Sequence, residues 1–198
     1  MNSPGIKDIL NASKLHPSKL KCVLPFGSRV YGTSSDVSDW DYVVIANTPD
    51  TNKEIKFSNL NLHIMTYEQF SLHLREHRSF AVECFFSPTQ LRLLELVRFS
   101  WTPNRDSLIH QFTHISNISW NSFEKKLDED YYKAIKDIFH SIRVPLFGVQ
   151  ILTTGKIENF SESNYILERL KSNCFGKTEI VEKFSKYRES ILERLQNS

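Results

Sequence analysis

One stretch of the chain, Phe26 to Ile45, constrains its fold more than any other. It begins with a glycine–serine turn, Gly27-Ser28, directly after an apolar run. About ten residues later come two aspartates, Asp39 and Asp41, and behind them an apolar run with strong strand preference. The order strand, glycine turn, paired acids, strand places a loop of backbone amides near two carboxylates.

The chemistry of the paired acids favours a bound cation. Side chains at positions i and i+2 of a strand share a face, so Asp39 and Asp41 are expected side by side. Two carboxylates that close repel each other unless a cation or a proton neutralises them. Magnesium prefers carboxylate and phosphate oxygens, and amides at a glycine turn can approach a phosphate closely. The combination predicts a site for a metal-bound nucleoside triphosphate, although each half alone is also typical of an ordinary capped turn.

The sequence of this stretch, G-S-R-V-Y-G-T followed by S-D-W-D-Y, resembles that of the nucleotidyltransferases of the DNA polymerase beta superfamily. Their signature is G-S, a short gap and then D-x-D. Within the superfamily, this segment is most similar to the motif of the RNA-repair-pathway polymerase-beta family. The resemblance extends over most of the chain through A-V-E-C-F-F-S-P, F-H-S-I-R and F-G-V-Q-I-L-T-T-G-K-I. It implies transfer of a nucleotidyl group from a nucleoside triphosphate such as ATP to a hydroxyl acceptor. The implied cofactor is Mg²⁺, with Mn²⁺ as the alternative, and the expected acceptor is an RNA end.

The resemblance also assigns roles to single residues. Asp39 and Asp41 become the catalytic, metal-binding pair. Gly27 and Ser28 would hold the β- and γ-phosphates of the nucleotide, and the Arg29 guanidinium would assist them.

At one position the chain departs from the superfamily pattern. A third carboxylate normally stands on the third strand, and here Asn61 occupies the matching position. Asparagine can coordinate a metal through its carbonyl oxygen but cannot act as a base. His63, two residues on, shares that face and is either a base, a ligand or part of the cleft wall. Glu83, an acid among apolar neighbours, either enters the site or pairs with a nearby cation.

A second long signal lies between Asp128 and Leu152. Four basic or potentially basic residues recur at helical spacing there and form one stripe: Lys133, Lys136, His140 and Arg143. Such a stripe is either a phosphate-binding ridge or an ordinary solvated helix face. The resemblance favours the ridge, with Lys136, His140 and Arg143 as contacts to a triphosphate or to RNA phosphates. Pro145 is expected to kink or divide the helix.

Rival functions remain open from sequence. His73 to His77 matches H-x-x-E-H, an inverted zinc-protease pattern, and His110 and His114 form a second histidine pair at helical spacing. Arginines flank the first pair and disfavour a dication there. The missing third acid would also suit a non-catalytic nucleotide or RNA sensor, and a protein could replace RNA as the acceptor.

The length and composition fit either one compact domain or two small lobes that share a core. With 198 residues and 40% hydrophobic residues, a normal core is available, and a net charge of +2 excludes a strongly polycationic binder. We expect an α+β fold, with a small mixed-sheet catalytic lobe over residues 1–103 followed by a helical lobe over residues 104–198. The triphosphate is expected in the cleft between the lobes.

Along the first lobe, strands are expected at 20–26, 39–45 and 53–66, and helices at 67–77 and 79–86. Three scattered cysteines, Cys22, Cys84 and Cys174, indicate free buried thiols in a reducing compartment. No stretch is long and apolar enough for a membrane helix, so a cytoplasmic protein without a membrane partner is expected. The sequence names neither the preferred base nor the oligomeric state.

Overall fold

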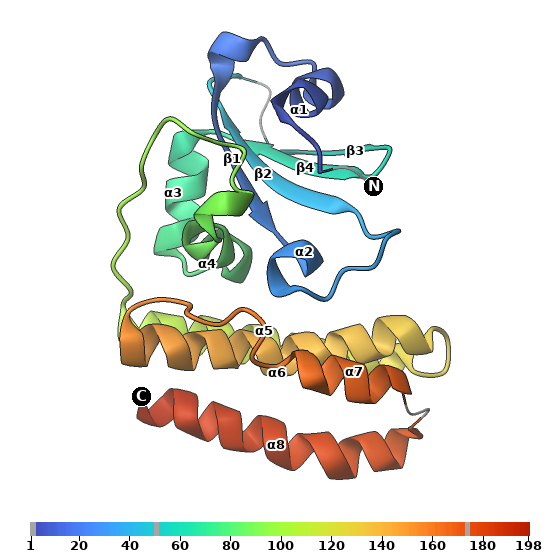
Figure 1. Ribbon diagram of the computed structural model, residues 1–198. Helices are drawn as coiled ribbons and strands as arrows, with labels where there is room; N and C mark the ends of the chain where they lie inside the picture. Colours follow the sequence, from blue (N-terminus) through green and yellow to red (C-terminus); the bar gives the residue numbers. More distant parts are fainter. Residues whose placement is uncertain (1–2, 50–51, 173–174) are drawn as a thin grey trace. The chain divides into compact units, whose positions relative to one another are not determined.

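The computed structural model describes residues 3–49, 52–172 and 175–198. The chain divides into two compact units, Met1–Thr102 and Pro103–Ser198 (Figure 1). The first unit contains a five-stranded mixed sheet and the second contains only helices among its described residues. The predicted α+β fold, a sheet unit followed by a helical unit, is confirmed.

The sheet of the first unit has the strand order β3-β4-β2-β1-β5. Its two central strands, β1 and β2, are antiparallel, β2 and β4 are parallel, and β3 and β5 pair antiparallel with β4 and β1. The elements of this unit are α1 (Ile6–Ser13), η1 (Pro17–Lys19), β1 (Leu20–Phe26), α2 (Ser28–Tyr31), β2 (Trp40–Ala46), β3 (Lys53–Phe57), β4 (Leu60–Met65), α3 (Tyr67–Arg75), α4 (Ser79–Phe86), η2 (Thr89–Leu91) and β5 (Leu94–Glu95).

The two faces of this sheet carry different layers. On one face α1 packs on β3 and β4, and its Ile9 joins a core with Tyr42, Val44 and Leu62. On the other face α3 packs against β2 and α4 against β1 (Figure 1). Because successive strand residues alternate between faces, Asp41 lies on the face opposite Tyr42, together with Asn61 of β4. The core on the α1 side therefore fixes which way the polar residues of the candidate site point.

The described residues of the second unit form four helices, and α6 is in contact with the other three. They are α5 (Arg105–Lys126), α6 (Tyr131–Thr154), α7 (Asn164–Ser172) and α8 (Lys177–Asn197). Their apolar stripes meet in one core that includes Phe123, Ile138, Ile142, Leu170 and Ile191. Gly155 ends α6 with a left-handed conformation, φ 80°, which glycine adopts without strain.

Pro145 does not divide its helix, because α6 runs unbroken through it, and the expected kink stays a prediction. A proline has no amide hydrogen to donate to the carbonyl four residues before it, here Ser141. In this fold the Ser116 hydroxyl of α5 donates to that carbonyl at 2.6 Å. A neighbouring helix thus satisfies the acceptor that the proline leaves open.

Two further expectations need correction. Residues 53–66 form a hairpin of two strands, β3 and β4, because Ser58, with φ 54°, turns the chain inside the run. The helix expected over 67–77 ends at Arg75, and His77 is left-handed with φ 54°.

Two of the three cysteines lie in the described chain. Cys22 and Cys84 are free and buried, as expected, and Cys174 lies outside the described residues. Among the helices of the described residues, none combines the length and the apolar character that crossing a bilayer requires.

Candidate active site

The backbone of Gly27 lies against the carboxylate of Asp41. Gly27 follows β1 and opens α2 with φ 81° and ψ −163°, a conformation essentially restricted to glycine. Phe26 and Asp41 are partners in the β1–β2 register, which brings the turn beside the acid. A Cβ added to Gly27 would stand only 2.5 Å from Asp41 Oδ2. The glycine turn and the acid of the D-x-D pair therefore converge, as the sequence pattern predicts.

The two aspartates differ in their surroundings. Asp39 is exposed and directly precedes β2, whereas Asp41 is half-buried within the strand. Burial raises the pKa of Asp41, the hydrogen bond from Asn61 lowers it, and the neighbouring Asp39 charge raises it again. A half-buried carboxylate beside a second acid is an unfavourable arrangement that a bound dication would relieve.

Asn61, the residue expected from the resemblance at the position of a third acid, lies beside Asp41. It is paired with Asp41 in the parallel β2–β4 register and donates a hydrogen bond from Nδ2 to Asp41 Oδ1 at 3.0 Å. Its own carbonyl oxygen, Oδ1, is buried and has no hydrogen-bond partner within the described parts of the chain. That oxygen is a neutral ligand candidate next to the two acids.

The donor set fits magnesium. Carboxylate and amide oxygens are the protein ligands that Mg²⁺ takes, and Asp39, Asp41 and Asn61 supply both kinds. No group of three or more His, Cys, Asp and Glu side chains that could hold a metal occurs among the described residues. The candidate site offers two acids and one amide as protein ligands, which leaves further coordination positions of the ion to phosphate oxygens and water.

His63 on β4, the strand next to β2, and Lys56 on β3, one strand further out, border this group. The His63 ring meets Phe26 edge to face, with ring centroids 5.3 Å apart, and the charges of both His63 and Lys56 lower the pKa of Asp41. Lys56 is in register with Asn61 on β3 and was not identified from the sequence. His63 thus stands in the wall of the site, one of the three roles that the sequence left open.

Arg29 has partners in the protein itself. Its Nη2 donates to the carbonyl oxygen of Ser38 at 2.6 Å, and its guanidinium lies 4.1 Å from the centroid of the Trp40 ring. These contacts tie α2 to the residues on either side of Asp39. Arg29 therefore holds the loop that carries the exposed acid, a role that its place in the motif did not reveal.

Glu83 is linked to the same turn from α4. It is 3% exposed, and one of its carboxylate oxygens accepts a hydrogen bond from the hydroxyl of Tyr31, the last residue of α2. Tyr31 is the tyrosine of the G-S-R-V-Y-G-T segment, and the sequence carries no signal for this contact with a residue 52 positions away.

The basic stripe on α6 is less uniform than the sequence suggested. Lys133 is bound to Asp130 at 2.9 Å, and Lys136 is exposed with its ammonium 4.3 Å from the centroid of the Tyr132 ring. Burial, and secondly the Arg143 charge, lower the pKa of His140 to about 3. His140 is therefore neutral at pH 7 and does not add a positive charge to the stripe.

Arg143 is held by its own helix. It is 5% exposed, its Nη2 is 2.8 Å from Nδ1 of His140, and its guanidinium lies 5.3 and 5.7 Å from the ring centroids of Phe139 and Phe147. A neutral His140 accepts that hydrogen bond through Nδ1, so its proton resides on Nε2. Of the three residues named from the resemblance, Lys136 presents the most accessible charge.

The inverted zinc-protease pattern does not form a metal site in this fold. His73 packs on Phe80 with ring centroids 5.2 Å apart, and His77 packs on Trp101 at 5.4 Å. Because α3 ends at Arg75, the two histidines do not share a helix face.

No model of a known protein family matches this chain, and no curated protein matches it significantly.

Proposed function

We propose that this chain is a Mg²⁺-dependent nucleotidyltransferase that moves a nucleoside monophosphate from a nucleoside triphosphate to a hydroxyl acceptor, with an RNA end as the acceptor. The observation that carries the proposal is the contact between the Gly27 backbone and the Asp41 carboxylate, with Asp39 near enough for its charge to raise the pKa of Asp41. It joins the two halves of the G-S and D-x-D signature within one unit of the fold.

Each residue of the group has a distinct part in the proposed reaction. Asp39 and Asp41, with the Asn61 carbonyl, would hold the metal. Once bound, the metal would neutralise charge on the phosphates. The amides at Gly27 and Ser28 would bind the β- and γ-phosphates, and Arg29 keeps Asp39 in place through Ser38 and Trp40. The acceptor hydroxyl attacks the α-phosphorus, its proton passes to solvent, and pyrophosphate leaves. Catalysis then rests on positioning and charge neutralisation.

From the second unit we assign Lys136, the most accessible of the three residues named from the resemblance, to a phosphate of the nucleotide or of RNA. His140 and Arg143 support it as a partly buried hydrogen-bonded pair on the same helix. We further place the protein in the cytoplasm, because Cys22 and Cys84 are free thiols, which suits a reducing compartment.

The direct test supplies the protein with each of the four ribonucleoside triphosphates, labelled at the α-phosphate, together with Mg²⁺ and RNA or protein acceptors. Label transferred to RNA supports the proposal, and label transferred to protein makes the chain a protein nucleotidylating enzyme. Asp39→Asn and Asp41→Asn should each abolish transfer while the protein stays folded. EDTA should abolish it as well.

One observation favours a second function, that of a nucleotide or RNA sensor without turnover. Asn61 stands where the superfamily pattern has an acid, and it is neutral. Nucleotide binding that needs Asp39 and Asp41, without transfer to any acceptor, would establish the sensor and refute the transferase.

A further inference from the structure

The seven histidines of the chain occupy very different surroundings, and only one pair is free to act together. His63 borders the candidate active site, His140 is bound to Arg143, and His73 and His77 are packed on aromatic rings. His16 is a single exposed residue that caps a short turn. His110 and His114 are the remaining two, both exposed on α5.

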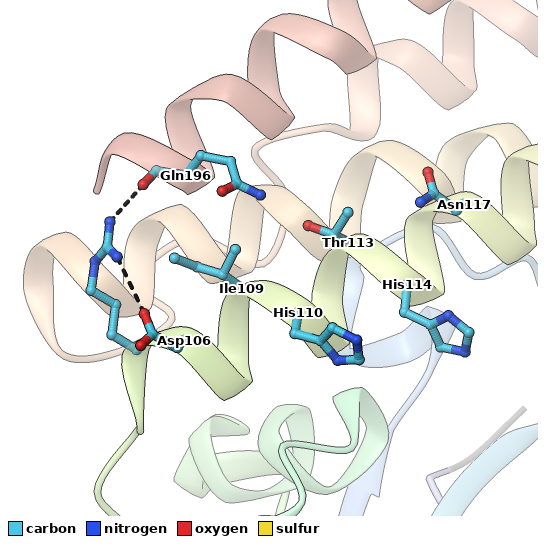
Figure 2. Close-up of a pocket in the computed structure, with 8 residues that line it drawn as sticks. Asp106, Ile109, His110, Thr113, His114, Asn117 and Gln196 are labelled. Atoms are coloured by element: carbon cyan, nitrogen blue, oxygen red, sulfur yellow. Dashed lines mark hydrogen bonds and ion pairs between the residues drawn. The ribbon is translucent and has the colours of Figure 1, made fainter.

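His110 and His114 have the geometry of a chelating pair. They are four residues apart within an unbroken helix, so their side chains lie on one face, one turn apart. The two rings are nearly parallel, with an interplanar angle of 6° and centroids 6.3 Å apart. Figure 2 shows both rings projecting from the same side of α5. Rotation about exposed side-chain bonds would bring one nitrogen of each ring to a common ion.

The surroundings tolerate a dication. Between Asp106 and Glu124, α5 contains no acidic or basic residue other than these two histidines. Arg105, at the start of the helix, has its charge shared with the carbonyl oxygens of Gln196 and Ser198 and with Asp106. Arg188 of α8 is directed at Ser116 and Asn117. His73 and His77, by contrast, have two arginines next to them in the sequence, Arg75 and Arg78.

The two histidines also line a groove of about 440 Å³ between α5 and the end of α8 (Figure 2). Thr113 lines the same groove, and its hydroxyl oxygen is buried without a hydrogen-bond partner in the part of the chain that the structure describes. Water or a small anion on an ion at the histidines would supply such a partner. The groove therefore leaves room for the other ligands that a two-histidine site needs.

We propose that His110 and His114 form a second metal site, for a d-block divalent cation of the Zn²⁺, Ni²⁺ or Cu²⁺ class. Imidazole nitrogen suits these ions, whereas Mg²⁺ prefers the oxygen ligands of the candidate active site. Two protein ligands leave the remaining coordination positions open to water or to an anion in the groove. The site is independent of the nucleotidyltransferase proposal, because none of its residues takes part there.

The test is calorimetric titration of the full-length protein, without an affinity tag, with Ni²⁺ and with Zn²⁺ in excess Mg²⁺. The expected result is one equivalent bound per chain. His110→Ala and His114→Ala should each weaken binding by at least about tenfold, because either change removes the chelate. Both positions are exposed on a helix, where alanine is favourable, so the variants should fold. His16→Ala, which removes a single exposed histidine, should leave binding unchanged.

A rebuilt pair supplies a positive control. Ile118 is 55% exposed and lies four residues after His114. Adding Ile118→His to His110→Ala should restore tight binding by creating a new pair one turn along. Bound Cu²⁺ in the wild type should show an electron paramagnetic resonance signal split by two nitrogens. Wild-type affinity equal to that of His110→Ala, or a signal with one nitrogen or none, would overturn the proposal.

Discussion

The Asp41 side chain illustrates how a residue can serve a site at the cost of stability. Its pKa is raised in the folded chain, mainly by burial. A raised pKa means that the folded state binds the proton more tightly than the unfolded state does. The stability that this proton contributes is complete below the unfolded pKa and is lost as pH rises through the folded one. At pH 7, without metal, the ionised carboxylate is therefore a burden on the fold.

From this follows a prediction for Asp41→Asn. Without metal at pH 7, the variant should unfold at a higher temperature than wild type, by roughly 2–4 °C for each kcal/mol removed. The difference should shrink as pH falls from 7 into the acidic range, because Asp41 takes up its proton there, and Mg²⁺ should stabilise wild type but not the variant. The measurement is thermal unfolding with EDTA and with Mg²⁺ across this pH range.

Asp39→Asn is the matched control for that measurement. Asp39 is exposed, so its neutralisation should change the metal-free unfolding temperature little, although it too should abolish transfer. An Asp41→Asn variant less stable than wild type in EDTA at pH 7 would show that burial of this carboxylate is not a cost.

Gly27 provides a second prediction at the residue scale. Gly27→Ala should lower the free energy of unfolding by about 1–3 kcal/mol because φ 81° with ψ −163° is strained for alanine. It should also abolish nucleotide binding, since the new methyl group would displace the Asp41 carboxylate. Urea unfolding and nucleotide titration measure the two effects.

Gly155→Ala separates strain from displacement. Gly155 has nearly the same φ, 80°, but a Cβ there would meet no heavy atom within 4 Å. This variant should lose stability by about 1–2 kcal/mol and still bind nucleotide. If Gly27→Ala bound nucleotide with the affinity of wild type, the glycine turn would not be part of the nucleotide site.

At the scale of elements, the proline of α6 depends on a residue of α5. The Ser116 hydroxyl donates to the Ser141 carbonyl that Pro145 cannot reach, and it accepts a hydrogen bond from Arg188 Nε at 2.9 Å. Both Ser116 and Ser141 are fully buried. Three helices thus meet at one hydroxyl group, which satisfies the carbonyl that Pro145 leaves open where α6 continues without a break.

Ser116→Ala should therefore cost about 1–3 kcal/mol by leaving a buried carbonyl and a guanidinium N–H without their partner. In a Pro145→Ala background the new amide can bond the Ser141 carbonyl, so the same substitution should cost about 1 kcal/mol less. Urea unfolding of the four proteins of this double-mutant cycle measures the coupling. Ser119→Ala, on the same helix, should show no coupling to position 145, and additive effects of Ser116→Ala and Pro145→Ala would refute the mechanism.

The elements also show how much of the structure could be predicted from the sequence. The strand–turn–helix–strand order around Gly27 and Asp41 was predictable, because positive-φ glycine and apolar alternation are local signals. The hairpin inside residues 53–66 was not, since the turn rests on Ser58 in a left-handed conformation rather than on glycine or proline. The contacts of Arg29 with Ser38 and of Tyr31 with Glu83 depend on tertiary packing, which spacing along the chain does not encode.

The uneven charge along the α6 stripe could not be predicted from the sequence for a similar reason. Helical spacing aligned Lys136, His140 and Arg143 correctly on one helix, but the charge of His140 depends on burial and on the neighbouring guanidinium. Periodicity reports which residues share a face and not which of them stay ionised.

At the scale of the whole molecule, each unit has a core of its own. The cluster that includes Ile9, Tyr42 and Leu62 lies entirely before residue 103, and the cluster that includes Phe123, Ile142 and Ile191 lies entirely after it. Every member of the candidate metal group, Asp39, Asp41 and Asn61, belongs to the first unit. Such a division suggests that the units can fold separately.

We therefore predict that residues 1–102 and 103–198, produced as separate chains, each fold with a cooperative thermal transition. The first should still bind Mn²⁺ in a way that Asp41→Asn abolishes, because all its metal ligands are present. Transfer should be lost in the first unit alone, because the proposed phosphate contact Lys136 is in the second. Circular dichroism and Mn²⁺ electron paramagnetic resonance provide the measurements. A first unit that transfers nucleotide as fast as the full chain would remove α6 from the proposed reaction, and one that folds without binding Mn²⁺ would remove the acids from it.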